Sequence, residues 1–165
     1  MTQYSCKCGE TDPTNFYARP RTKCKKCHKD YQNNRYANFS VEDKSKYLSQ
    51  QYEWQQSNIF QYRFTTARSR AYKRGLDFDI TPEYLKTLYE LQESKCYYSG
   101  IPFTDSKDGL YSISIDRIDS SKGYVKGNVV LAASIINSMK NDLSLKEFLT
   151  VVRTLLDYQE SLVEP

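Results

Sequence analysis

The stretch that most constrains the fold is SISIDRIDSSKGYVKGNVVL, residues 112–131. Ile113 and Ile115 alternate with polar residues, which predicts a strand over 112–119 with one apolar face and Asp116 on the other. Strands disfavour aspartate, yet two aspartates flank an arginine where this strand ends. The charged residues therefore serve either a turn or a site.

The residues that follow this strand predict a loop, a second strand and a helix. The loop at 120–127 contains two glycines, and the apolar run at 128–132 predicts the second strand. The helix is expected at about 133–141. This order of strand, loop, strand and helix is the framework that carries the candidate site residues.

The order and the residues on it resemble the HNH endonucleases, whose active site is a ββα-metal unit. In that family an Asp-His-Ile or Asp-His-Val lies late in the first strand, an Asn opens the second strand, and a second Asn or a His follows on the helix. This chain has Asp116-Arg117-Ile118, then Asn128, then Asn137, with Lys140 one helical turn further. The resemblance covers roughly residues 95–148 and rests on order and spacing.

The resemblance implies a role for each of these residues. Asp116 and Asn137 would hold one Mg²⁺ or Mn²⁺ ion through oxygen atoms, the ligands that such hard cations take. Asn128 would orient the loop, although a plain turn asparagine is an equal alternative. Lys140 would contact a phosphate or would simply be solvated. The implied reaction is hydrolysis of phosphodiester bonds in double-stranded DNA.

One departure from the family pattern concerns the general base. Most members have a histidine after the metal-binding aspartate, and Arg117 stands at that position here. Arginine cannot accept a proton at neutral pH, but it binds phosphate in a bidentate way. A restriction-enzyme branch with Asp-Arg relies on a tyrosine, which favours Tyr98, with a core tyrosine as the alternative. The ordinary pKa of tyrosine is near ~10, so the metal and Arg117 would have to lower it.

A second departure concerns zinc within the nuclease core. Zinc-bearing relatives carry two cysteine pairs there, and this chain keeps only Cys96. One thiolate cannot hold a structural zinc, so Cys96 is expected to be a small buried apolar residue. The core is then expected to close by packing of Ile101, Val130, Leu131, Ile135 and Ile136.

The other four cysteines form two close pairs, Cys6-x-Cys8 and Cys24-x-x-Cys27. Two such pairs can supply four thiolates to one tetrahedral, structural Zn²⁺. The first pair is one residue shorter than the usual spacing. Disulfides are the alternative, and they are disfavoured in a reducing compartment; His28 as a ligand is awkward because it adjoins Cys27. The pairs resemble zinc knuckles that often precede HNH cores.

Positive charge is concentrated in two stretches of a chain whose net charge is only +4. Residues 19–35 contain a single acid and residues 63–74 contain none, and both stretches are interleaved with aromatic residues. This pattern favours DNA as a partner over an ordinary solvated surface. The candidate DNA-binding residues are Lys25, Lys26, Arg63, Arg68, Arg70, Lys73 and Arg74.

The rest of the chain predicts helices. Residues 30–56 indicate a connecting helix or a pair of helices, and a basic helix that follows is expected to end at Gly75. Thr81 is a typical N-cap for the next helix. Ser144 and Glu147 form a capping box that opens a C-terminal helix. Its apolar stripe is expected to face the core: Leu145, Phe148, Leu149, Val152, Leu155 and Leu156.

These features predict an α+β fold, with a small ββα-metal nuclease core packed with helices and an N-terminal zinc-binding module. The expected parts are a basic zinc module (1–35), a helical connector (36–75) and the nuclease domain with its C-terminal helix (76–165). The expected function is that of an HNH endonuclease, and the alternative is an inactive nucleic-acid-binding protein with an HNH-like core.

The surroundings of the protein are predicted less sharply. No secretory signal or membrane-length apolar run is present, so a cytoplasmic, intracellular location is expected. A phage-encoded protein in the cytoplasm of its host is one form of this expectation. No membrane partner is expected. The sequence is compatible with a monomer and with a homodimer.

Overall fold

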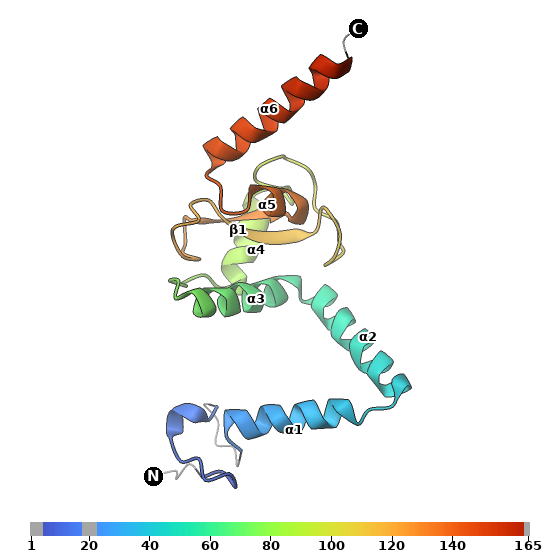
Figure 1. The fold of residues 1–165 in the computed structure, drawn as a ribbon, viewed down its shortest axis with the longest axis vertical. Helices are drawn as coiled ribbons and strands as arrows, with labels where there is room; N and C mark the ends of the chain where they lie inside the picture. Colours follow the sequence, from blue (N-terminus) through green and yellow to red (C-terminus); the bar gives the residue numbers. More distant parts are fainter. Residues whose placement is uncertain (1–4, 18–22, 164–165) are drawn as a thin grey trace. The chain divides into compact units, whose positions relative to one another are not determined.

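The chain forms two compact units, Met1–Gln51 and Tyr52–Pro165, each described here by itself. A computed structural model describes residues 5–17 and 23–163, shown in Figure 1, so residues 19–22 of the first basic run lie outside the described residues. The expected division at residues 35 and 75 stays a prediction.

The first unit contains a 3₁₀ turn (Pro13–Asn15), helix α1 (Lys25–Ala37) and most of helix α2 (Val41–Ser57), whose last residues belong to the second unit. The sequence left one connecting helix or a pair open, and the structure has a pair. The small buried cluster of this first unit consists of Cys6, Phe16 and Cys24. Among the described residues of this unit, so little apolar surface is buried that they form no core of ordinary size.

The second unit is built around a two-stranded antiparallel sheet, β1 (Ile113–Arg117) and β2 (Val129–Ala133), followed directly by helix α5 (Ser134–Lys140). In the register Asp116 lies opposite Val130 and Ile115 lies opposite Leu131. The α+β class and the order strand, loop, strand, helix are confirmed.

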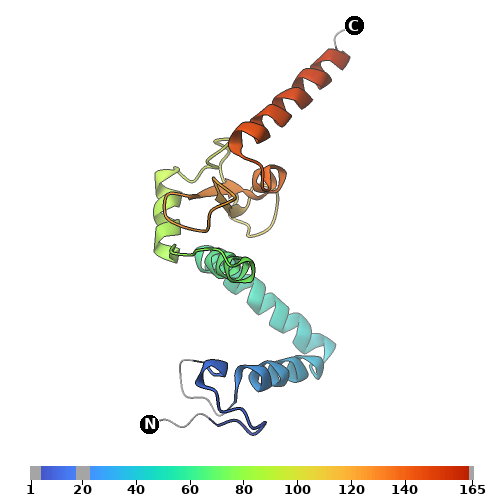
Figure 2. The same ribbon diagram turned by 60° about the vertical axis from the view of Figure 1, so that its left-hand side comes forward.

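The two faces of this sheet differ as the alternation predicts. Ile113, Ile115 and Leu131 belong to a buried core to which helices α3 (Ile59–Arg74) and α4 (Pro82–Leu91) contribute Ala67, Ala71 and Leu85. The other face of β1 carries Ser114 and Asp116, and α5 packs on the sheet. Figures 1 and 2 show β1 and α5 on the same side of α3 in both views.

Two helix boundaries follow their local chemistry. The residue after α3 is Gly75, whose φ of 64° is the left-handed conformation that ends helices at little cost for glycine. The hydroxyl of Thr81 accepts a hydrogen bond from the Tyr84 N–H at the start of α4. Both sequence-based boundaries are confirmed.

The loop between the strands is held against the segment that joins α3 to α4. The Tyr124 N–H donates to the Asp77 carbonyl at 2.9 Å, and the Asp79 N–H donates to the Tyr124 carbonyl at 3.1 Å. A Cβ at Gly123 would lie 2.2 Å from the Asp77 oxygen. Only glycine therefore allows the backbones to approach this closely.

Cys96 is buried against Ala132 and Ala133, with Ile135 and Ile136 packed on the same cluster. The expected burial of Cys96 among apolar side chains is confirmed. Val130 and Leu131 are also buried, but Ile101 is 36% exposed, so its place in this core was predicted wrongly.

Helix α6 (Leu145–Val163) begins as expected and then departs from the expectation. The Glu147 carboxylate accepts from the Ser144 N–H at 2.8 Å, which confirms the capping box. The stripe does not face a core: Phe148 is buried, whereas Leu149, Leu155 and Leu156 are each more than half exposed. The prediction of a core-facing stripe is wrong because α6 packs on α5 near its start and then extends away from the sheet (Figure 2).

Candidate active site and cysteine cluster

Six of the sequence-predicted residues of the second unit line one cavity of about 340 Å³. Its walls come from α3, β1, α5 and the turn after α5. Arg63, Arg70 and Arg74 share one face of α3, since they are seven and four residues apart. Those three arginines line the cavity together with Asp116, Arg117 and Asn137.

Asp116 is 5% exposed, and one of its two carboxylate oxygens already has interaction partners. Oδ2 accepts from the Tyr98 hydroxyl at 2.6 Å and lies 3.1 Å from the Lys140 ammonium nitrogen. Within residues 5–17 and 23–163, no hydrogen bond is made to Oδ1. Since Asp116 lines the cavity, Oδ1 is the oxygen available to a ligand there.

Asn137 is oriented by the same strand. Its Nδ2 donates to the Ser114 hydroxyl at 2.7 Å and to the Ile115 carbonyl at 3.4 Å. Because both contacts use the amide nitrogen, the amide oxygen is left to accept or to coordinate. A carboxylate oxygen and an amide oxygen on one cavity wall form a donor set that fits a hard divalent cation.

Lys140 is fully buried, although its charge would favour the surface. Besides its ion pair with Asp116, its ammonium donates to the Arg117 carbonyl at 3.1 Å. The alternative of a solvated lysine is therefore wrong. The Lys140 ammonium contacts Oδ2 of the Asp116 carboxylate and compensates its buried charge.

Arg117 serves the loop that follows β1. Its NH1 donates to the carbonyls of Ser120 at 2.8 Å and Lys122 at 2.9 Å. The guanidinium carbon lies 5.2 Å from the centre of the Tyr124 ring, and NH2 is 3.7 Å from the Asp142 carboxylate. Arg117 therefore closes the turn while its other edge borders the cavity; a grip on phosphate stays a prediction.

Asn128 holds the same loop from its other end. Its Oδ1 accepts from the Asp119 N–H, and its Nδ2 donates to the carbonyls of Asp119 and Gly123. The side chain is buried and does not line the cavity. Its geometry is that of an orienting residue.

Asp119 caps the turn that follows β1. Hydrogen bonds from the Ser121 hydroxyl, the Lys122 ammonium and the Ser121 N–H lower the pKa of the Asp119 carboxyl to about 2. Its nearest cation is the Lys122 ammonium at 3.2 Å. The second aspartate of the motif therefore caps a turn, and the first faces the cavity.

Tyr98 lies half-buried beside Asp116. Burial, followed by the hydrogen bond to Asp116 and the charge of that carboxylate, raises the pKa of the Tyr98 hydroxyl above its ordinary value. In this arrangement Tyr98 is a hydrogen-bond donor. Its role as a base stays a prediction.

The arginines of α3 divide into two groups. Arg63 NH2 donates to the Lys107 carbonyl at 2.5 Å, burial lowers the pKa of Arg63, and its Nε is a buried donor with no partner among the described residues. Arg70 and Arg74 line the cavity with it. Arg68 lies over the Phe64 ring at 5.9 Å, and neither Arg68 nor Lys73 contributes to the cavity wall.

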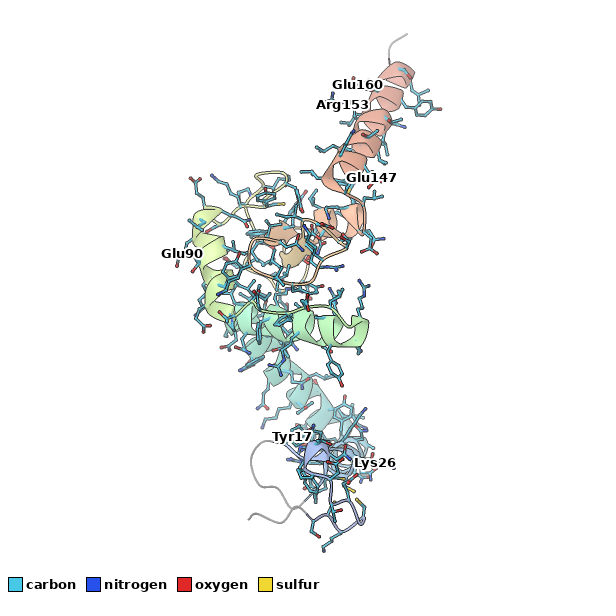
Figure 3. All side chains as sticks on the ribbon, turned by 90° about the vertical axis from the view of Figure 1, so that its left-hand side faces the viewer. Tyr17, Lys26, Glu90, Glu147, Arg153 and Glu160 are labelled. Carbon is cyan, nitrogen blue, oxygen red and sulfur yellow. The ribbon has the colours of Figure 1, made fainter. Side chains whose placement is uncertain are left out.

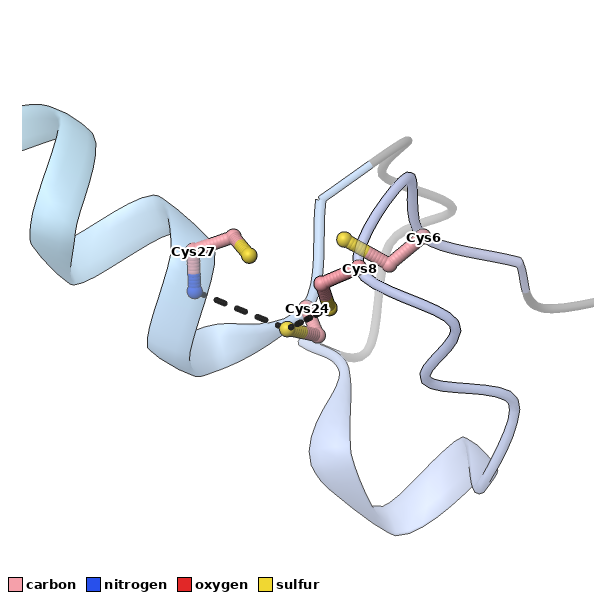
Figure 4. Close-up of side chains that lie close together, drawn as sticks. All are labelled: Cys6, Cys8, Cys24 and Cys27. Carbon is pink, nitrogen blue, oxygen red and sulfur yellow. Dashed lines mark hydrogen bonds between the residues drawn. The ribbon is translucent and has the colours of Figure 1, made fainter.

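The four N-terminal cysteines form a second candidate site, shown in Figure 4. The sulfur atoms of Cys6, Cys8, Cys24 and Cys27 all lie within 4.8 Å of one another, and all four thiols are free. A tetrahedral zinc with bonds of about 2.3 Å would separate its sulfur ligands by about 3.8 Å. The Sγ atoms of Cys8 and Cys24 are 3.6 Å apart, so the cluster fits such an ion.

Helix α1 helps to gather the cysteines. Cys24 caps its N-terminus and accepts from the Cys27 N–H, so the two side chains meet within one turn. Backbone N–H groups lower the pKa of Cys6 to about 6, whereas the neighbouring thiols raise the pKa of Cys27 to about 12. His28 is not part of the cluster; its ring lies edge-on to Tyr17 at 5.5 Å.

The basic residues of the first unit lie at the start of α1. The Lys25 ammonium donates to the Thr14 carbonyl at 2.7 Å, and Lys26, labelled in Figure 3, is exposed. Contact of either residue with DNA stays a prediction.

Three of the cavity-lining residues that sequence reasoning did not select contact the candidate site residues: Ser114, which orients Asn137; Tyr124, whose ring lies near the Arg117 guanidinium; and Asp142, beside the same guanidinium. Ser114 had a usable signal, because strand alternation places it on the face of Asp116. The other two come close to Arg117 only through the loop and the turn after α5.

Comparison with known proteins gives distant relatives. No family model matches the chain. It is 32% identical over 96 residues to the uncharacterized protein R423 of Acanthamoeba polyphaga mimivirus, covering 58% of this chain and 17% of that protein. It is 32% identical over 87 residues to an uncharacterized 29.0 kDa protein from the dda-modA intergenic region of Enterobacteria phage T4, covering 53% of this chain and 34% of that protein. The chain thus spans about a third or less of these relatives.

One solved structure is similar over 98% of this chain and 97% of its own, with 21% identity and a TM-score of 0.42. It is described as the rare-cutting HNH restriction endonuclease PacI, with an extraordinary mechanism of DNA perturbation. Separately, none of the helices within the described residues is both long and apolar enough to cross a bilayer.

Proposed function

We propose that the chain is a metal-dependent endonuclease of HNH type that hydrolyses phosphodiester bonds in double-stranded DNA. The observation that carries the proposal is the composition of one cavity wall. Two oxygen atoms, from Asp116 and Asn137, are left without partners among the described residues where three arginines of α3 also converge.

The donor set supports a cation site at Asp116 and Asn137. A Mg²⁺ or Mn²⁺ ion held there would stabilise the negative charge that develops on the phosphate and the leaving oxygen. The chain itself orients both ligands: Lys140 and Tyr98 fix the carboxylate through Oδ2, and Ser114 fixes the amide through Nδ2. Such supporting contacts typically change metal affinity or activity by about 10- to 100-fold when removed.

The charge of the cavity supports a phosphate substrate. Four arginines line it, against the two aspartates Asp116 and Asp142. Arginine is suited to phosphate because its planar donors match two oxygens at once. We assign Arg70 and Arg74 to substrate phosphates, while Arg117 positions the loop and borders the same cavity. Lys25 and Lys26 would add backbone contacts outside this site.

The mechanism also needs a general base that accepts the proton of the attacking water. Tyr98 is the candidate with a place in the site, since its oxygen lies 2.6 Å from Asp116. Its present role as a donor means that it would have to release its proton before it could act. Tyr98→Phe keeps the ring and removes both this candidate base and the hydrogen bond to the Asp116 carboxylate.

Two observations favour the alternative of an inactive nucleic-acid-binding protein. The Lys140 ammonium already compensates the charge of Asp116, and no histidine lines the cavity. A protein of this kind would bind DNA through the same arginines without cleaving it. The two proposals therefore differ in cleavage and not in binding.

Plasmid nicking separates the two proposals. Wild-type protein with Mg²⁺ or Mn²⁺ should convert supercoiled DNA to nicked or linear forms, and Asn137→Ala should abolish conversion while DNA binding persists. Ser138→Ala is the matched control, because Ser138 lines the same cavity and makes no contact with either ligand oxygen. Protein that binds DNA but never cleaves it with either metal would support the inactive alternative.

Binding measured against salt tests the substrate surface. Arg70→Ala/Arg74→Ala should lower the slope of log affinity against log salt by about one for each arginine that binds a phosphate in the wild type. Arg68→Ala/Lys73→Ala removes the same charge from outside the cavity wall and should change the slope less. Equal effects of the two pairs would mean that the cavity is not where DNA phosphates bind.

We also propose that residues 1–35 bind one structural Zn²⁺ through Cys6, Cys8, Cys24 and Cys27. The mutual approach of the sulfur atoms supports this, and a segment with so small a core gains its stability from such an ion. The two relatives come from viruses, which is consistent with a phage-encoded protein that acts inside the host cell.

A further inference from the structure

The cavity beside Asp116 has a second carboxylate on its wall, that of Asp142 in the turn after α5. The Asp142 side chain is 67% exposed, and its Oδ1 lies 3.7 Å from NH2 of Arg117. Within the described part of the chain, no hydrogen bond is made to this carboxylate. A negative charge repels a phosphate that enters the cavity, so Asp142 does not serve to bind the DNA backbone.

The turn that carries Asp142 is fixed by its neighbours. The Asn141 N–H donates to the Asn137 carbonyl at 2.9 Å, and the Leu143 N–H donates to the Lys140 carbonyl at 3.0 Å. Asn141 has a φ of 48° and a ψ of −126°, a conformation that residues with a side chain rarely adopt. Strained residues of this kind are concentrated at functional sites. The backbone therefore holds Asp142 at the cavity wall although its side chain is exposed.

The proposed hydrolysis requires a group that accepts a proton from water, and the cavity wall limits the choice. Among the described residues that line it, the two carboxylates are the groups that are basic at neutral pH, and no histidine is present. Asp116 uses Oδ2 for Tyr98 and Lys140, and its Oδ1 belongs to the candidate cation site. Tyr98 donates its own proton to Oδ2 and does not line the cavity. The carboxylate that remains is that of Asp142.

We propose that Asp142 is the general base of the hydrolysis, a role that rests on the proposed function and takes the place of Tyr98 in it. The Asp142 carboxylate accepts a proton from a water molecule as the water oxygen forms a bond to phosphorus. The bond between phosphorus and the leaving sugar oxygen breaks, and that oxygen takes a proton from solvent. Asp142 then releases its proton to solvent, so each bond that is cut consumes one water and needs no other reactant.

Arg117 positions this base. Its NH1 is held by the carbonyls of Ser120 and Lys122, and its guanidinium carbon lies 5.2 Å from the centre of the Tyr124 ring. At 3.7 Å the contact between NH2 and Asp142 is an ion pair without a direct hydrogen bond, so the carboxylate oxygens remain available to water. The positive charge of Arg117 also offsets the repulsion between Asp142 and the phosphate.

The test is the rate of plasmid nicking in a single turnover at saturating DNA, with Mg²⁺ or Mn²⁺ present. Asp142→Asn keeps the shape of the side chain and removes the proton acceptor, so the rate should fall about 100- to 10,000-fold. Asp142 is 67% exposed, so the circular dichroism of the variant should be that of wild type. Asp157→Asn removes the same charge from an exposed position of α6 and is the matched control, with the wild-type rate expected.

A small carboxylate added to the solution separates a chemical role of Asp142 from a structural one. Formate should raise the nicking rate of Asp142→Ala, because it can occupy the space that the side chain leaves, and should not raise the rate of Asn137→Ala. A second measurement needs no catalytic metal. In magnesium-free buffer without chelator, Asp142→Asn should bind DNA at least as tightly as wild type, because a negative charge has been removed from the cavity.

The outcomes distinguish this inference from the function on which it rests. Wild-type protein that never cleaves DNA would overturn the proposed function and the role of Asp142 with it. Cleavage by wild type together with an equally active Asp142→Asn, or with an Asp142→Ala that formate does not restore, would overturn the role of Asp142 alone. Weaker DNA binding by Asp142→Asn would also overturn it, because the side chain would then act before the chemical step.

Discussion

Replacement of Lys140 by methionine probes the centre of the candidate active site. The substitution keeps the length of the side chain and removes the ammonium that lies 3.1 Å from the Asp116 carboxylate. Lys140 is fully buried and Asp116 is 5% exposed, so little water can take the place of the ammonium. Loss of one partner from a buried ion pair costs about 3–5 kcal/mol, a large part of the stability of about 5–15 kcal/mol that is typical of a domain.

Amide hydrogen exchange of β2 measures this loss without denaturant. Amides of buried strands such as Leu131 exchange through opening of the whole cooperative unit. A loss of 3–5 kcal/mol, at about 1.4 kcal/mol per factor of ten, corresponds to exchange that is between about a hundredfold and several thousandfold faster. The buffer should be free of magnesium but should contain no chelator, so that zinc stays with the cysteine cluster.

A double variant identifies the cause. If the cost of Lys140→Met is the unpaired charge of Asp116, then Lys140→Met/Asp116→Asn should be more stable than Lys140→Met alone. The asparagine keeps an oxygen that can accept from Tyr98. Added Mg²⁺ should also protect Lys140→Met more than wild type, because the carboxylate has lost its cation. A double variant no more stable than the single, or a loss under about 1 kcal/mol, would refute the reasoning.

Three further predictions concern other parts of the chain. Metal analysis should find one zinc ion per wild-type chain, and Cys24→Ser should lose it; an unchanged zinc content would exclude the cluster as the site. Ser114→Ala removes the shorter of the two hydrogen bonds that orient the amide of Asn137 and should lower nicking activity about 10- to 100-fold, whereas Ser138→Ala should not. Asp119 should titrate near pH 2 by NMR, because Ser121 and Lys122 favour its charged form. Since the folded pKa lies below the unfolded value near ~4, the stability that this carboxylate adds is present above pH 4 and is lost as the pH falls towards 2. A value near 4 would mean that the turn contacts are absent.

Local signals predicted the elements of this protein well. The period-two alternation around Ile113 and Ile115, the cap at Thr81, the glycine after α3 and the capping box at Ser144 all act within a few residues of each other. Their outcome depends on backbone geometry and nearby hydrogen bonds, so neighbouring sequence contains the necessary information. The cysteine cluster was predictable for the same reason, since the short spacing within each pair brings its two thiols together.

The same reasoning failed where a side chain depends on distant partners. The stripe of α6 has the periodicity of a buried helix, but periodicity does not reveal whether the covering surface belongs to the same chain. Ile101 looked like a core residue and lies at the surface. Lys140 was expected either to contact a phosphate or to be solvated, and it is fully buried, because its partner Asp116 is 24 residues away in the sequence and adjacent in space.

The sequence by itself determined the order of strand, loop, strand and helix, the four-cysteine cluster and the two basic stretches. Only the tertiary structure decided that Arg63, Arg70 and Arg74 of α3 line the cavity of Asp116 and Asn137, that Arg117 closes a loop, and which oxygen of each candidate ligand remains available. The physical reason is the range of the interactions. Helix and strand periodicity arise between near neighbours, whereas a cavity and its charge depend on packing of segments that are about 40 to 70 residues apart, which no local pattern encodes.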